Sequence, residues 1–175
     1  MSEIEHLKYP IGNFQKPEVI TASHLMGWIK TLQNFPDQLR ELLATASEET
    51  WSKTYRPEGW TILQLVHHCA DSHMNAFIRF KLALTEEPPT IKPYHEDRWA
   101  VMPDVISVHA QVSIDLLESL HARWAVLLRS LHSDDLAHEY IHPEQGKRFN
   151  LAEAIGMYDW HCRHHLEHIK IALKS

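Results

Sequence analysis

Residues 150–173, NLAEAIGMYDWHCRHHLEHIKIAL, decide the fold. Apolar side chains recur through this stretch at three- and four-residue steps, which is the period of an α-helix with one buried face. Asn150, with a glutamate three residues later, is a typical N-terminal capping pattern. We therefore predict a helix from Asn150 to the end of the sequence.

Three further stretches show the same helical period. The predicted helices run from Thr21 to about Ala46, from about 61 to 85, and from Val108 to Leu131. Thr61, with Gln64 three residues later, forms a capping box at the start of the second. Pro36 predicts a kink or a short break near Phe35 in the first, because proline removes a backbone donor and crowds the preceding turn.

The segments between these helices are expected to be irregular. Residues 1–20 contain Pro10, Gly12 and Pro17 and are predicted to be an extended arm that lies on the body. Residues 86–103 hold four prolines and are expected to cross between the ends of the bundle or to cover a cleft. No stretch shows a convincing period of two. The sequence thus predicts one all-α domain, residues 1–175, built as a four-helix bundle.

Composition narrows the possible partners. The chain has 17 basic and 23 acidic side chains and a formal net charge of −6, which argues against a nucleic-acid partner. No apolar run approaches the roughly 20 residues that cross a bilayer, and the acidic start is unlike a signal peptide. Cys69 and Cys162 are too few for a disulfide framework. We expect a cytoplasmic protein with neither a nucleic-acid nor a membrane partner.

Histidine is abundant, with 15 residues in 175. In the last helix, residues 161 and 165 lie roughly 40° apart around the axis, so such a pair can bind one metal ion. His165 falls within the apolar stripe, whereas His164 points away from it. Spacing slightly prefers His161 over His168 as the partner of His165. A catalytic site of the zinc type usually has three protein ligands, so a third is expected elsewhere.

The second helix offers the sequence HHCADSHMN, residues 67–75. His73 falls on the apolar stripe of this helix, while His68 lies on the opposite face together with Ser72, Asn75 and Arg79. That polar face is either exposed to solvent or forms the wall of a polar cleft. Periodicity alone supports His68 and His73 equally as the third ligand.

Several segments resemble the YfiT-type metal-dependent hydrolases of the DinB-like superfamily. They include GWTILQLVHHCADSHMNAFIRFKLALTEEPPTIKPY (59–94), LHARWAVLLRSL (120–131) and MYDWHCRHHLEHI (157–169). The resemblance implies a four-helix bundle, often dimeric, that binds one divalent metal ion per subunit, zinc or nickel. It also implies the ligands, namely His68, eight residues after Trp60, and the pair His161 and His165.

Three neutral imidazoles around a divalent ion leave its charge uncompensated, so a bound water loses its proton more easily. The same ion could also hold a thiolate, so the ligand set permits either hydrolysis or thiol transfer. The resemblance makes metal-dependent hydrolysis of a small-molecule substrate the expected function. A thiol S-transferase of the bacillithiol type and a non-catalytic metal-binding protein remain alternatives. The resemblance also makes a homodimer the expected assembly.

Other residues near the predicted ligands have weaker assignments. Asn75 and Arg79 are possible substrate contacts on the face of His68. No catalytic base is assigned, since Asp71 and Glu167 are better explained as carboxylates at the surface or behind the ligands. The two cysteines each follow a predicted ligand and point roughly 100° away from it, so they are expected to be small buried apolar residues and not ligands.

Overall fold

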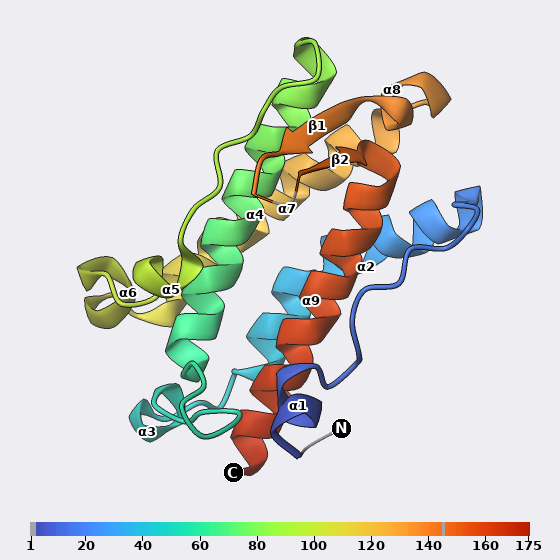
Figure 1. Cartoon of the computed structure of the whole chain (residues 1–175). Coiled ribbons are helices and arrows are strands. Elements are labelled where there is room, and N and C mark those ends of the chain that lie inside the picture. The colour runs from blue at the N-terminus through green and yellow to red at the C-terminus, as the bar shows by residue number, and fades with distance from the viewer. Residues whose placement is uncertain (1–2, 145) are drawn as a thin grey trace.

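The computed structural model describes residues 3–144 and 146–175. Four long helices dominate the fold (Figure 1). They are α2 (Ala22–Leu42), α4 (Ile62–Thr85), α7 (Ala110–Ser130) and α9 (Leu151–Lys174). The prediction of an all-α four-helix bundle is confirmed, and each long helix lies close to its predicted range.

The order of the helices around the bundle differs from their order in the chain. Both α2 and α4 pack against α7 and against α9. The consecutive helices α2 and α4 therefore lie on a diagonal, as do α7 and α9. This arrangement makes α4 and α9 direct neighbours, so the two histidine-rich sequences face each other.

Side chains at the helix starts satisfy backbone donors as the sequence predicts. The Thr61 hydroxyl accepts from the Gln64 amide at 3.2 Å, and the Gln64 side chain accepts from the Thr61 amide at 3.0 Å. The Asn150 side chain accepts from the backbone of Glu153 at 2.8 Å. These three bonds satisfy amides at the helix starts that have no partner within the helix.

The break predicted near Phe35 is absent, and α2 continues through Pro36. Pro36 and Phe35 are both buried in the centre of the bundle. Packing of this face against α7 and α9 holds the helical backbone in place despite the lost donor. The carbonyl four residues before Pro36, that of Leu32, accepts a hydrogen bond from His121 of α7 instead.

The predictions for the connecting segments need correction. Residues 1–20 are not wholly extended, because Glu3–Lys8 form helix α1. Although no stretch of the sequence shows a convincing period of two, a hairpin of β1 (Glu139–His142) and β2 (Lys147–Asn150) precedes α9. Tyr140 and Phe149 pair across this hairpin and are both buried, so tertiary packing stabilises strands too short to show a period. The other short helices are α3 (Glu48–Trp51), α5 (Glu96–Trp99), α6 (Pro103–Ser107) and α8 (Ser133–Ala137).

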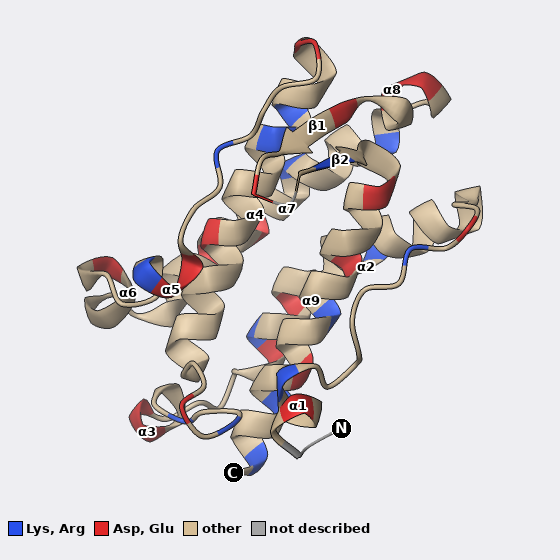
Figure 2. Ribbon diagram, in the orientation of Figure 1, with Lys and Arg blue, Asp and Glu red and all other residues tan. Residues whose placement is uncertain are grey.

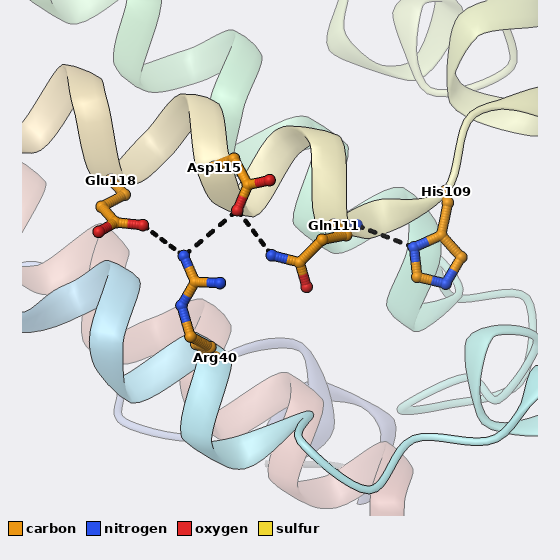
Figure 3. A network of polar contacts seen from close by, with 5 residues as sticks. All are labelled: Arg40, His109, Gln111, Asp115 and Glu118. Carbon is orange, nitrogen blue, oxygen red and sulfur yellow. Dashed lines mark hydrogen bonds and ion pairs between the residues drawn. The ribbon is translucent and has the colours of Figure 1, made fainter.

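Polar contacts join α2 to α7 at the surface (Figure 3). Arg40 of α2 pairs with Glu118 and, at 3.3 Å, with Asp115 of α7. Gln111 donates to the same Asp115 carboxylate at 2.7 Å. Figure 2 shows Lys and Arg interspersed with Asp and Glu over the described elements. No helix in the described ranges is long and apolar enough to span a membrane.

Candidate metal centre

Three imidazoles converge where α4 meets α9. His68 comes from α4, and His161 and His165 come from successive turns of α9. One nitrogen from each lies within 4.8 Å of the others. The Nε2 atoms of His68 and His161 are 3.3 Å apart. The structure therefore brings together the three residues that the resemblance implies as ligands.

The separation of one pair of these nitrogens fits a small divalent ion. Two nitrogens bound tetrahedrally at 2.0–2.1 Å lie about 3.3 to 3.4 Å from each other. The distance between His68 Nε2 and His161 Nε2 is 3.3 Å, which matches that edge. The donor set of three imidazoles suits zinc and nickel alike.

Burial keeps the three imidazoles neutral. Burial lowers the pKa of His68 to about 4, and the charge of His168 acts in the same direction. Burial and then neighbouring histidines hold the pKa values of His161 and His165 well below the usual range. A neutral ring keeps one nitrogen lone pair, which is the form that binds a metal.

A second group of histidines lies next to the first on α9. His164, His165 and His168 also offer ligand atoms within 4.8 Å of one another. However, His168 Nε2 already donates to the Lys8 carbonyl at 3.1 Å. The prediction that His164 points away from the interior is wrong. It is buried because Tyr9, from the segment before α2, and Trp160 of α9 stack on its ring.

Two more histidines continue from the three-imidazole cluster into the core. His73 Nε2 lies 3.0 Å from His161 Nδ1, and His73 Nδ1 lies 2.8 Å from His121 Nε2. His121 Nδ1 in turn lies 2.5 Å from the Leu32 carbonyl. His68 and His73, which periodicity supports equally, thus both approach His161, one from the cleft and one from the core.

The three-imidazole cluster lies at the base of a cleft of about 440 Å³. Aromatic rings form part of its wall, and the Trp60 ring lies 4.7 Å from that of His68, centroid to centroid. A larger groove of about 660 Å³ lies between α2 and α7, but no histidine, cysteine or carboxylate lines it. Of these two cavities, only the smaller one is lined by histidines and carboxylates. Its polar lining beyond the histidines comes from Lys8, Tyr9, Tyr55, Arg56, Glu58, Glu96 and Asp97.

The cleft carboxylates were not among the residues that sequence reasoning singled out. Glu96 and Asp97 stand in α5, within the proline-rich segment 86–103 that was expected to cross the bundle or to cover a cleft. Partial loss of hydration raises the pKa of Glu96, and the charge of Asp97 adds to the effect. The sequence signal for these two residues is an acidic pair that stands between Pro93 and Trp99.

The predicted substrate contacts point elsewhere. Asn75 donates to the Asp71 carbonyl of its own helix at 2.9 Å, and Arg79 donates to the Lys92 carbonyl at 3.5 Å. Neither is among the residues that line the cleft. Asp71 and Glu167 are likewise absent from its lining, and Glu167 pairs with Lys170 at 2.6 Å.

The two cysteines behave as the sequence predicts. Cys69 and Cys162 are free thiols with no exposed surface. Burial raises the pKa of both thiols, so they stay protonated at neutral pH. Both belong to the apolar core of the bundle and not to the histidine cluster.

Comparison with known proteins gives first the class of the protein. The family model described as the DinB superfamily matches residues 31–169. The chain therefore belongs to the DinB superfamily.

Individual relatives narrow the class further. A protein of Bacillus cereus (strain 03BB102), named "Putative metal-dependent hydrolase", is 48% identical over 163 residues, which cover 93% of each chain. A protein of the same name from Bacillus anthracis is 47% identical over the same length and coverage.

Solved structures agree with this placement. YfiT from Bacillus subtilis is described as a probable metal-dependent hydrolase with an unusual four-helix bundle topology. It is 39% identical, with a TM-score of 0.93 over 97% of each chain. The mycothiol-dependent maleylpyruvate isomerase, at 18% identity, matches with a TM-score of 0.66 over 83% of this chain and 60% of its own. The second likeness shows a shared fold alone.

Proposed function

We propose that His68, His161 and His165 bind one divalent ion, zinc or nickel, and that the protein hydrolyses a small-molecule substrate in the adjoining cleft. The observation that carries this proposal is the convergence of three neutral imidazoles from α4 and α9, with two of their nitrogens 3.3 Å apart. The names of the relatives support a metal-dependent hydrolase.

An ion with three neutral ligands and an open position lowers the pKa of a bound water toward 7. The chain's own residues shape the space beside that position. Trp60 and Trp160 provide apolar walls against which a substrate can pack. Arg56 adds a positive charge, and its Nε is buried without a hydrogen-bond partner among the described residues.

Glu96 is the carboxylate best suited to accept a proton in this cleft. It lines the same cleft as the histidines, and its pKa is raised, which brings it closer to the operating pH of a general base. Asp71 and Glu167, which lie outside the cleft lining, are poorer candidates. We therefore propose Glu96 as the base.

The proposal is tested by metal content and turnover together. The protein and its His161→Ala variant are loaded with zinc or nickel, dialysed and measured by elemental analysis. We expect one ion per chain in the first and less than a tenth of that in the variant, because two imidazoles bind far more weakly than three. Ester and amide libraries should be hydrolysed only by the loaded parent protein.

The same experiment separates the alternative functions. Consumption of an electrophile that requires an added low-molecular-weight thiol, with no turnover in water alone, would identify a thiol S-transferase. Several weakly bound ions per chain without any turnover would identify a storage protein. Full metal content in the His161→Ala variant would contradict the proposed site. The homodimer stays a prediction.

A further inference from the structure

We propose that His73, His121 and His168 are positioning residues that fix which ring nitrogen of each α9 ligand carries the proton. This inference rests on the proposed function, because it concerns the two ligands that α9 contributes. It gives a role to buried histidines outside the three-imidazole cluster. For each α9 ligand, a chain of hydrogen bonds between imidazoles starts at a backbone carbonyl and fixes which nitrogen of the ligand is protonated.

The first chain starts at the carbonyl of Leu32. A carbonyl only accepts, so the His121 nitrogen beside it, Nδ1, must carry the proton. In a neutral ring the other nitrogen, Nε2, is then an acceptor, and His73 Nδ1 donates to it at 2.8 Å. His73 Nε2 therefore accepts from His161 Nδ1 at 3.0 Å. The result is a lone pair on His161 Nε2, the atom that faces His68.

Pro36 explains why the Leu32 carbonyl is available. In an uninterrupted helix this carbonyl would accept from the amide of residue 36, four positions later. Proline has no amide hydrogen, so the carbonyl keeps a free acceptor in the core of the bundle. His121 is buried with 1% of its surface exposed, and its Nδ1 supplies the missing donor.

The second chain starts at the carbonyl of Lys8, the last residue of α1. His168 Nε2 donates to this carbonyl at 3.1 Å, which leaves His168 Nδ1 as an acceptor. His165 Nδ1 lies 3.3 Å away and is the donor. His165 is then left with its lone pair on Nε2. Both α9 ligands therefore use the same tautomer, each fixed by a different element.

Burial supports this assignment by keeping every ring neutral. Burial lowers the pKa of His121 and of His168 to about 4, and that of His73 falls well below its usual value. Metal-binding histidines commonly donate their second nitrogen to a carboxylate or a carbonyl. Here the acceptor is a neutral imidazole, so no negative charge stands directly behind the ligands and offsets the charge of the ion.

The experiment measures zinc affinity by chelator competition in the full-length chain. Loss of such an outer partner commonly weakens metal binding 10- to 100-fold, and we expect that range for His73→Phe. We expect the same for His121→Phe, although His121 touches no ligand. Without it, His73 can turn its proton toward His161 and force the wrong tautomer. His73→Gln should recover most of the affinity, because its amide can both donate and accept.

His67→Phe is the matched control. His67 is also a buried histidine of α4, with bonds of 2.7 Å to Ser113 and 3.0 Å to the Val108 carbonyl, and both of its ring nitrogens are thus engaged away from the cluster. Its loss should destabilise the fold while zinc affinity stays within threefold of the parent. The double variant His73→Phe/His121→Phe should bind no more weakly than His73→Phe, because both residues act through one chain.

A second measurement does not depend on metal. Long-range ¹H–¹⁵N NMR of the metal-free protein distinguishes protonated ring nitrogens from those with a lone pair. We expect a lone pair on Nε2 of both His161 and His165, and a switch at His161 in His121→Phe. Protonated Nε2 atoms in the parent, or unchanged zinc affinity in His73→Phe, would overturn the inference. Two tightly bound ions per chain would mean that His164, His165 and His168 bind an ion of their own, and would overturn the part of the inference that concerns His168. A parent with this tautomer pattern and no bound ion would instead contradict the proposed function alone.

Discussion

At the scale of single residues, the histidines in and around the three-imidazole cluster have different roles. Histidines four apart on α9 share a face, and helical geometry predicts that pair from the sequence. The choice between His68 and His73 could not be made in this way, because both rings are buried and both approach His161. A helical wheel only separates the apolar face of a helix from its polar face. In α4 the polar face, with His68, lines the cleft, whereas the apolar face, with His73, meets a cluster of histidines within the core.

Cys162 tests whether a residue next to a proposed ligand takes part in metal binding. It follows His161 in sequence, has no exposed surface and belongs to the apolar core. We expect Cys162→Ala to lower the free energy of unfolding by about 1 kcal/mol through the small cavity it leaves. Zinc affinity should stay within a factor of two, since the side chain points away from the ion. Urea denaturation and chelator competition measure the two effects, and a tenfold loss of affinity would show that the thiol takes part in binding.

At the scale of elements, the four long helices could be predicted because each repeats its apolar pattern over 21 or 24 residues. The short elements could not. Strands β1 and β2 have four residues each, and their stability comes from partners such as the buried pair Tyr140 and Phe149. Helix α1 has six residues and is held by the contact between Lys8 and His168, which are 160 positions apart. Contacts between residues so far apart in the chain produce no repeating pattern in the local sequence.

The cap of α9 provides a prediction at this scale. The Asn150 side chain accepts the Glu153 amide hydrogen at 2.8 Å at the start of the helix that carries two of the proposed ligands. Asn150→Ala should lower the free energy of unfolding by about 1 kcal/mol, because a buried first-turn amide loses its acceptor. Asn150→Asp keeps the acceptor and should have a much smaller effect. Chemical denaturation of the metal-free proteins checks both, and equal stability of the three would argue against the cap.

At the scale of the whole molecule, the buried histidines couple stability to pH. In the folded protein His68, His121 and His168 have pKa values of about 4, below the ordinary value of 6.5, and burial is the main cause. Between these values the unfolded chain binds more protons than the folded one. Their contribution to stability is complete above about pH 6.5 and is lost as the pH falls toward 4.

The metal-free protein should therefore unfold more easily in mild acid. Each of these histidines can contribute a slope of up to about 1.4 kcal/mol per pH unit. Asp71 acts in the opposite sense, because burial and then the charge of Asp104 raise its pKa to about 6. Three histidines outweigh one carboxyl, so urea midpoints in the presence of a chelator should fall from pH 7 to pH 5. Unchanged midpoints over that range would contradict this prediction.

The contact between the Lys8 carbonyl and His168 sets an order for biosynthesis. Residue 8 leaves the ribosome early, but its partner becomes available only after nearly the whole of α9 has been translated. His68, His73 and His121 lie on α4 and α7, so they can come together before α9 is translated. His161, His165 and His168 lie on α9 and are translated later. A product that stops before α9 would have only one of the three proposed ligands, so we expect metal binding to require that α9 has been translated.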